Sequence, residues 1–535
     1  MYQRSLSLGL CVVFIAAAGV ETQNAGAGID YAMYSKIRDE GLHRSQALDH
    51  VSWLADVYGP RLQGSPAMRQ AADWVAKKLT NWGLANVHQE TFPFGKGWGL
   101  VRFSAHMIEP QVMPLAAVPR SWTPGTSGTV TGEVVRVDIR TDADFEKYRG
   151  KLAGKIVLTQ SLREVRMLEG IVVQRWNDAL LKEAMTMPIP AARPPAEAGE
   201  GRTGLADRIQ QFFVDERVVA AFDRGGDTSI VAGDNQMSWR TQRTDGGTIF
   251  PSGGGGREAT SPKMVPSVTL AVEHYNRMIR VLDKALPVKV ELDIRTEFYD
   301  DAGANGFNIV GDLPGTDPNG EYVLLGAHLD SVGTGVGATD NAVGVSVMME
   351  ALRILKTVGA RPKRTIRIGL WGGEEEGLLG SKAYVAAHLA DVKTMTLKPE
   401  HQKIAAYFNL DNGTGRIHGV WMQGNLAIVP VFEEWIKPLR DLEVTTLTPQ
   451  SVRGSDYLSF DDVGIPAFQF MQDRLEYNSR THHSNMDVVD RVQRDDLVQM
   501  AVVAATFAFN TATRDERLPR KPLPQPAPAA RSSQP

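Results

Sequence analysis

The sequence predicts an α/β fold, in which a sheet is flanked by helices, together with a second, β-rich region. From about residue 291 onward, apolar strand-like segments alternate with segments of helical apolar spacing, which is typical of an α/β sheet. Residues 118–290 differ, because short β-rich pieces there are separated by glycine and polar stretches. The chain has 535 residues. Since a single core stops growing near roughly 250–300 residues, we expect more than one domain.

A helix is predicted directly after Ser65. Ser65 is a typical helix cap, Pro66 suits the first turn, and apolar residues continue at helical spacing until Gly83. We assign this N-terminal part, residues 28–117, to the same discontinuous domain as residues 291–513.

Four strands are predicted in the second half of the chain, and each ends next to an acid or a histidine. "YVLLGAHLD" runs to His328, "RTIRIGLW" leads into three glutamates, "KIAAYFNLD" ends at Asp411, and "IPAFQFMQ" precedes a histidine pair. Helices are predicted in "NAVGVSVMMEALRILKTVG", "GLLGSKAYVAAHL", "PVFEEWIKPLRDL" and "RDDLVQMAVVAATFAFNTATR". Ligands of open α/β sheets bind beyond the carboxyl ends of the strands, so we expect a functional site there.

The two ends of the chain are predicted to lie outside the folded domains. Residues 1–27 contain Arg4, an apolar run that ends near Ile15 and small residues from Ala18 onward, which is the pattern of a secretory signal peptide. The run is shorter than the roughly 20 residues of a membrane span, so we expect an exported protein, periplasmic or secreted, without stable membrane insertion. Residues 514–535 are proline-rich and predicted to be disordered.

Composition and cysteine count exclude several classes of function. A formal net charge of -4 gives no reason to expect nucleic acid as a partner. The single cysteine, Cys11, lies in the predicted signal peptide, which excludes disulfides and thiolate chemistry from the mature chain. A metal site would therefore use histidine, aspartate and glutamate.

Carboxylates and imidazoles gather at the predicted strand ends. The candidates are His328, Asp330, Asp340, Glu374, Glu375, Asp411 and His483. Histidine and carboxylate ligands without sulfur suit zinc, and also cobalt or manganese. Five of these residues, His328, Asp340, Glu375, Asp411 and His483, are candidate metal ligands. Five ligands are more than one tetrahedral zinc ion needs, so we expect two ions about 3.5–4 Å apart that share a carboxylate. A cation at this place would offset the repulsion among Glu374, Glu375 and Glu376.

Five segments together resemble the motif set of a known family. In order and spacing, "GAHLDS", "ATDNAVG", "GGEEEGLLGS", "FNLD" and "HHSNMD" are similar to the dizinc exopeptidases that include bacterial leucyl aminopeptidases and plasma glutamate carboxypeptidase. The resemblance implies the zinc exopeptidase fold, a mixed, mostly parallel twisted sheet flanked by helices. The insert, residues 118–290, resembles a protease-associated domain in "GEVVRVD" and "LAGKIVL".

The same resemblance implies a role for each motif residue. One zinc would be held by His328 and Asp411 and the other by Glu375 and His483, with Asp340 bridging both. Glu374 would be the general base and Asp330 would orient His328 through the far imidazole N–H. The implied reaction is hydrolysis of terminal bonds in short peptides or dipeptides by a hydroxide between the two zinc ions, available because metal binding lowers the pKa of water to about 7.

Several neighbouring residues carry secondary expectations. Glu376 is expected to be solvated, and His482 to be structural, because the family pattern places the ligand second in the pair. Asp487 is expected to orient His483. Tyr457 and Tyr477 are candidates for stabilising the oxyanion of the tetrahedral intermediate.

Other functions stay open from the sequence alone. "GTGVGA", residues 333–338, matches a dinucleotide-binding pattern and would suit a nucleotide-binding oxidoreductase. Glutaminyl cyclases resemble the same family but use one zinc for acyl transfer, and a binding module on an inactive peptidase would have lost ligands. An aminopeptidase or dipeptidase is favoured over a carboxypeptidase, whereas side-chain preference and oligomeric state are undetermined.

Overall fold

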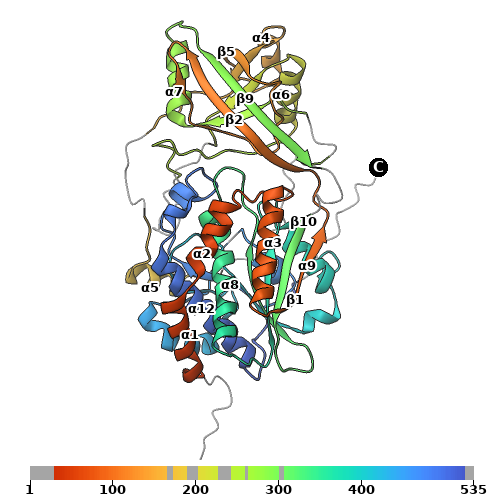
Figure 1. The fold of residues 1–535 in the computed structure, drawn as a ribbon, viewed down its shortest axis with the longest axis vertical. Helices are drawn as coiled ribbons and strands as arrows, with labels where there is room; N and C mark the ends of the chain where they lie inside the picture. Colours follow the sequence, from red (N-terminus) through yellow and green to blue (C-terminus); the bar gives the residue numbers. More distant parts are fainter. Residues whose placement is uncertain are drawn as a thin grey trace, which may run out of the picture.

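The protein has two lobes stacked along its longest axis (Figure 1). The computed structural model describes residues 29–165, 173–189, 203–226, 242–258, 263–299, 306–452 and 454–524. The predicted signal peptide, residues 1–27, lies outside the described residues. In Figure 1 the lower lobe contains α1, α3, α8 and α12, and the upper lobe contains β2, β5 and β9.

An eight-stranded mixed sheet forms the centre of the lower lobe. In spatial order its strands are β1 (Ala85–Phe92), β10 (Gly306–Leu313), β12 (Thr365–Trp371), β11 (Tyr322–His328), β15 (Ile404–Asn409), β18 (Ala467–Gln472), β16 (Ile417–Trp421) and β17 (Thr446–Thr448). Its four middle strands, β12, β11, β15 and β18, are parallel to one another. The α/β fold predicted from the alternating pattern is confirmed.

The middle strands are largely apolar because helices cover both faces of the sheet. In β11, Val323 and Leu325 face one apolar cluster, whereas Tyr322 and Leu324 face another. Successive side chains of a strand point to opposite faces, so a strand buried on both sides is a continuous apolar run. This packing makes the strand ends a rigid base for whatever side chains follow them.

Among the described residues, eight α-helices accompany this sheet within the lower lobe. They are α1 (Tyr31–Arg44), α2 (Ala47–Ser52), α3 (Pro66–Asn81), α8 (Val343–Thr357), α9 (Leu379–His388), α10 (Val429–Ile436), α11 (Tyr457–Asp461) and α12 (Arg494–Thr513). The predicted start of α3 is confirmed, because the Ser65 side chain accepts a hydrogen bond from the Met68 amide at 3.1 Å and Pro66 opens the helix.

A second eight-stranded sheet builds the upper lobe. In spatial order it contains β3 (Met113–Pro114), β2 (Gly97–Glu109), β9 (Lys289–Tyr299), β5 (Val130–Arg136), β6 (Lys155–Leu158), β7 (Ala220–Asp223), β8 (Ser267–Leu270) and β4 (Ala117–Pro119). The helices of this region are α4 (Phe145–Tyr148), α6 (Thr203–Asp215) and α7 (Val272–Leu282). The sheet thus includes strands on both sides of residues 118–290, because β2 and β9 pair along most of their length.

One helix from the middle of this region leaves the upper lobe. Helix α5 (Asp178–Thr186) lies beside the lower lobe in Figure 1. Its residues Leu181 and Ala184 pack with Trp421 and Met471 of the lower sheet. The two lobes are therefore joined by side-chain packing as well as by the chain connections.

The prediction that residues 514–535 are disordered is wrong for residues 514–524. Arg520 donates to the carbonyls of His401 at 3.0 Å and Ile404 at 2.7 Å, and Leu518 is buried. Proline prevents this segment from forming a helix of its own. It does not prevent extended chain from binding to carbonyl groups of another element. Residues 525–535 lie outside the described part.

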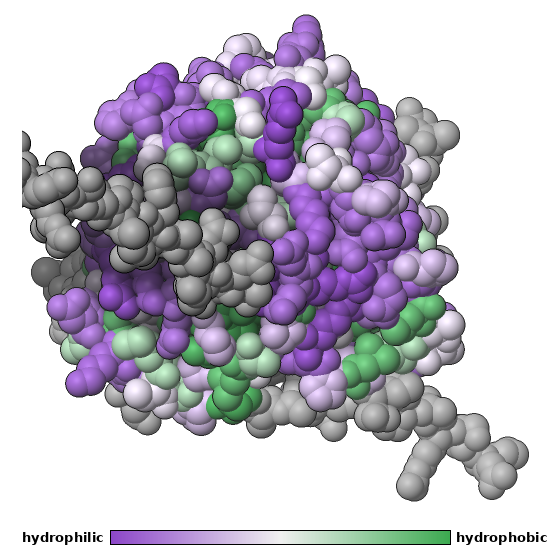
Figure 2. Space-filling model, turned by 90° about the horizontal axis from the view of Figure 1, so that it is seen from below, coloured by the Kyte–Doolittle hydropathy of each residue, from purple (hydrophilic) through white to green (hydrophobic). Residues whose placement is uncertain are grey.

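The surface of the described residues is largely hydrophilic where it can be seen. Figure 2 shows the lower lobe from below, with apolar side chains as separate patches between hydrophilic ones. Among the described helices, none combines the length and the hydrophobicity that crossing a bilayer requires.

The buried His50 makes the stability of the lower lobe sensitive to acid. Its ring lies 5.3 Å from the Trp82 ring and 6.0 Å from the Trp74 ring, and neither ring nitrogen has a hydrogen-bond partner. Burial, with a smaller contribution from Lys78 and Arg353, lowers the pKa of His50 from 6.5 to about 3. The folded protein therefore keeps this ring neutral under conditions in which the unfolded chain binds a proton.

We expect the variant His50→Phe to lose less stability than the wild type on acidification. Between pH 7 and pH 4 the unfolded wild-type chain binds a proton at His50, whereas the folded state keeps this ring neutral. The free energy of unfolding of the wild type therefore falls by about 2–3 kcal/mol. Urea unfolding at both pH values, with chelator present, measures the difference. The exposed variant His43→Gln is the control, and equal losses in all three proteins would contradict the prediction.

Candidate metal centre

The order of the strands brings the predicted site residues to one edge of the lower sheet. His328 is the last residue of β11, Glu374 follows the end of β12, and Asp411 follows the end of β15. His483 lies in the loop after β18. These four strands are adjacent and parallel, so their carboxyl ends point the same way.

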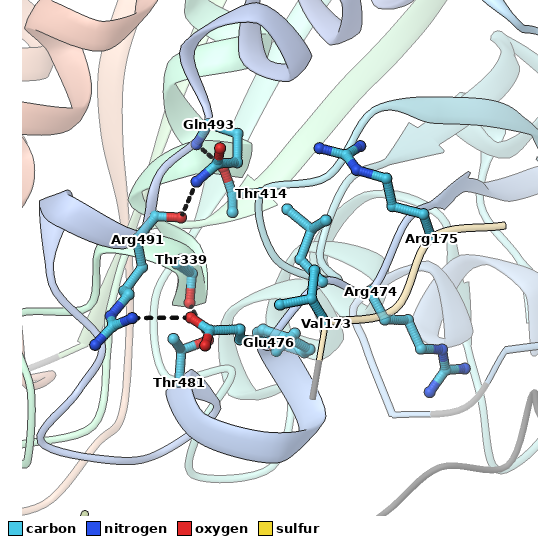
Figure 3. Close-up of a pocket in the computed structure, with 11 residues that line it drawn as sticks. Val173, Arg175, Thr339, Thr414, Arg474, Glu476, Thr481, Arg491 and Gln493 are labelled. Atoms are coloured by element: carbon cyan, nitrogen blue, oxygen red, sulfur yellow. Dashed lines mark hydrogen bonds and ion pairs between the residues drawn. The ribbon is translucent and has the colours of Figure 1, made fainter. Parts of the chain in front are cut away.

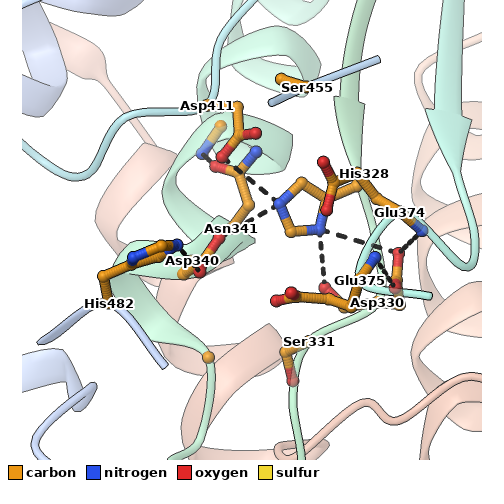
Figure 4. A network of polar contacts seen from close by, with 12 residues as sticks. His328, Asp330, Ser331, Asp340, Asn341, Glu374, Glu375, Asp411, Ser455 and His482 are labelled. Atoms are coloured by element: carbon orange, nitrogen blue, oxygen red, sulfur yellow. Dashed lines mark hydrogen bonds and ion pairs between the residues drawn. The ribbon is translucent and has the colours of Figure 1, made fainter. Parts of the chain in front are cut away.

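His328 stands at the centre of the first group of ligands (Figure 4). Its Nε2 lies 3.1 Å from Oδ1 of Asp340 and 3.4 Å from Oδ1 of Asp411. Its Nδ1 lies 3.1 Å from the backbone oxygen of Asp330 and 3.7 Å from the carboxylate of that residue. The nearer partner of Nδ1 is thus the carbonyl, and Nε2 faces the carboxylates.

His483 forms the second group. Its Nε2 lies 2.8 Å from Oε2 of Glu375 and 3.4 Å from Oδ2 of Asp340. The neighbouring His482 reaches only Asp340, at 3.6 Å, and its ring lies 3.8 Å from the His483 ring. Asp340 therefore offers one oxygen to each group.

The donor atoms fit a pair of metal ions. Among the described residues, two sets have ligand atoms within 4.8 Å of one another, one of His328, Asp340 and Glu375 and the other of Asp340, His482 and His483. Asp340 belongs to both. Oδ2 of Asp340 and Oε1 of Glu375 are buried and accept no hydrogen bond. Buried charged oxygens without a partner are costly, and cations at this place would remove that cost.

The three consecutive glutamates share a raised pKa. Burial raises the pKa of Glu374 and of Glu376 well above the ordinary value, and it also raises the pKa of Glu375. The expectation that Glu376 is solvated is wrong, because its Oε2 is buried and accepts no hydrogen bond. The turn between Gly373 and Gly377 folds the glutamates back against the sheet edge instead of extending them into water.

Two further aspartates hold the backbone of the site. The Asp330 carboxylate accepts hydrogen bonds from the amides of Glu374 at 3.3 Å and Glu375 at 3.2 Å. Asp487 accepts from the amides of Thr339 at 2.6 Å and Asp340 at 3.2 Å. The expected pairing of Asp487 with His483 is therefore replaced by support for the Asp340 backbone.

The sequence did not single out Arg61, which lies in the segment "GPRLQGS". Arg61 is fully buried and donates to the carbonyls of Leu329 at 2.8 Å, Val336 at 3.0 Å and Gly337 at 2.9 Å. The loop of residues 333–338 thus turns carbonyl oxygens toward a guanidinium, and this arrangement gives no support to the dinucleotide-binding interpretation. An arginine within a glycine-proline turn was the signal available in the sequence.

A cavity of about 660 Å³ opens in front of these residues. Its lining includes Asp340, Glu374, Glu375, Asp411, Tyr477, His482 and His483, as well as Trp421, Arg474 and Gln242. A smaller cavity of about 190 Å³ lies on the other side of Tyr477 and is shown in Figure 3. Of the two candidate tyrosines, Tyr477 lines both cavities, whereas Tyr457 is buried in the apolar cluster on the opposite face of the sheet.

This arrangement defines a class of protein, a hydrolase with a dinuclear metal centre at the edge of an α/β sheet. Comparison with known proteins agrees. Residues 308–508 match peptidase family M28. Mouse carboxypeptidase Q is 26% identical over 497 residues, which are 93% of this chain and 90% of that protein.

Solved structures share the fold. The M28 peptidase precursor of Shewanella amazonensis has a TM-score of 0.63 at 23% identity, over 92% of this chain and 98% of that chain. A zinc aminopeptidase of Bacillus subtilis has a TM-score of 0.51 at 19% identity, over 86% and 93% of the two chains. Residues 308–508 thus carry the similarity to peptidase family M28, and the protein is a metallopeptidase.

We expect His483, and not His482, to be required for one of two bound zinc ions. Nε2 of His483 reaches both Glu375 and Asp340, whereas His482 reaches Asp340 alone. His483→Ala should lower the zinc content by one ion per chain, and His482→Ala should leave it unchanged. Elemental analysis after dialysis measures this, with His106→Ala in the upper lobe as control. The opposite pattern would transfer the ligand role to His482.

Proposed function

We propose that this protein is an exported exopeptidase that cleaves terminal bonds of dipeptides and short peptides. In this proposal His328 and Asp411 hold one zinc ion, Glu375 and His483 hold the other, and Asp340 bridges the two. The observation that carries the proposal is that the two oxygens of Asp340 face different histidines from different strand ends.

The chemistry divides between the ions and the protein. Zinc supplies Lewis acidity and lowers the pKa of water to about 7 when it is bound. Glu374 lies on the wall of the large cavity beside these ligands, so its carboxylate accepts a proton from water and returns it to the leaving amine. Asp330 holds the Glu374 amide and thereby the position of this base. Tyr477, on the same wall, is the better placed of the two tyrosines to donate to the developing oxyanion.

Dipeptides are proposed as substrates because the names of similar proteins include both a carboxypeptidase and an aminopeptidase. A carboxypeptidase and a zinc aminopeptidase both match this chain. A dipeptide satisfies both names, because its single peptide bond adjoins both termini. The insert supports short substrates, since it contributes Gln242 to the wall of the cavity.

Glu374→Gln should abolish turnover and keep the metal. The amide is nearly the same size as the carboxylate but cannot accept the proton, so kcat is expected to fall by about 10²–10⁴. Elemental analysis should still find two zinc ions per chain. Glu376→Gln is the matched control and should retain most of the activity. A Glu374→Gln protein with wild-type kcat would remove this residue from the reaction.

Four peptides show whether the enzyme requires a free amino end or a free carboxyl end of its substrate. A free dipeptide, its N-acetyl derivative, its C-terminal amide and a free octapeptide are incubated with the enzyme and analysed by mass spectrometry. We expect the free dipeptide to be cleaved fastest and the amide to be cleaved faster than the N-acetyl form, and chelator should stop all cleavage. Rapid cleavage inside the octapeptide, or cleavage that survives metal removal, would overturn the proposal.

A further inference from the structure

The loop that follows β18 carries five residues of the cavity wall, and its backbone is unusual. Tyr477, His482 and His483 lie within residues 472–487, here called the ligand loop. His483 has a φ angle of 62°, in the left-handed region that side chains other than glycine rarely adopt. Such a conformation persists where the surroundings hold it in place.

One support of the ligand loop comes from residues 173–177, here called the first strap. Gln174 and Leu475 exchange two backbone hydrogen bonds of 2.9 and 2.8 Å. The Asp473 carboxylate accepts from the Trp176 amide at 2.6 Å and from Arg175 at 2.7 Å. Figure 3 shows Arg175 and the loop residues around the smaller cavity. This segment of the insert thus pairs with the start of the ligand loop.

The other support comes from residues 243–249, here called the second strap. The Asn485 side chain accepts from the Ile249 amide at 2.7 Å and donates to the Gly247 carbonyl at 3.1 Å. The Arg243 amide donates to the Ser479 carbonyl at 2.7 Å. This strap therefore contacts the ligand loop on both sides of the histidine pair.

Charged side chains strengthen the second contact. Arg480 donates to Thr248 Oγ1 at 3.3 Å and lies 4.0 Å from the Asp245 carboxylate. On its other side Arg480 lies 3.9 Å from Glu476, which in turn accepts from Arg491 at 3.1 Å. The guanidinium thus connects the second strap to the part of the loop directly before His482.

We propose that the two straps of the insert are positioning elements of the metal centre, which hold the ligand loop in the conformation that presents His483 to Glu375 and Asp340. Both straps contact the loop through backbone groups as well as side chains, so a displacement of the insert moves the loop with it. Residues that orient a metal ligand typically change metal affinity by about 10–100-fold when they are altered. The insert then sets the affinity of one metal site and leaves the site of His328 and Asp411 unaffected.

The test alters only strap residues and measures metal binding. The triple variant Arg175→Gln, Trp176→Phe, Thr248→Val removes the Arg175 ion pairs, the Trp176 indole donor to Gln472 and the Arg480 acceptor. Chelator competition yields two zinc dissociation constants, and hydrogen exchange reports on residues 477–485. The control is Arg136→Gln, whose ion pair with Asp283 lies within the upper lobe.

We expect one zinc dissociation constant to rise at least about tenfold, the other to stay constant, and exchange in residues 477–485 to accelerate. Unchanged constants and unchanged exchange in a folded triple variant would overturn the proposal. If the triple variant does not fold, Thr248→Val and Arg175→Gln are measured singly, with a smaller change of the same kind expected. Wild-type protein that binds no zinc would refute the metal centre itself, and the exchange of residues 477–485 would still test the straps.

Discussion

The repulsion among carboxylates gathered at one sheet edge is the constraint on which this structure depends. Asp340, Glu375 and Asp411 are drawn from three different strand ends into a space where several of their oxygens have no hydrogen-bond partner. Apolar packing on both faces of the sheet supplies the free energy that holds them there. Divalent cations at this edge would offset the repulsion, so metal binding would add to the stability of the folded state.

Polar groups beneath the site keep its loops in place. Arg61 is fully buried, and burial lowers its pKa to about 10, with the carboxylates of Asp487 and Asp330 acting in the opposite direction. It therefore remains charged near neutral pH and places a fixed positive charge among the aspartates that bind the site backbone. Asp330 and Asp487 act in the same way from the acidic side. None of the three is an ordinary packing residue, and each connects loops from distant parts of the chain.

The two lobes are less separate than the division into two sheets suggests. The family match covers residues 308–508, in the lower lobe, whereas the similarity to carboxypeptidase Q extends over both lobes. Helix α5 packs on the lower sheet, and Gln242 lines the large cavity.

The sequence by itself determined the α/β alternation, the start of α3 and the types of residue available as ligands, because strand and helix periodicity and metal preference are local properties. The sequence motifs alone point to His328, Asp340, Glu375, Asp411 and His483 as metal ligands. Local pattern did not reveal the role of Arg61, the burial of Glu376, the docking of residues 514–524 or the return of α5. Partners of Arg61, of residues 514–524 and of α5 lie more than a hundred residues away in the chain, and such contacts exist only in the folded protein. The tertiary structure alone decided which oxygen of Asp340 faces which histidine.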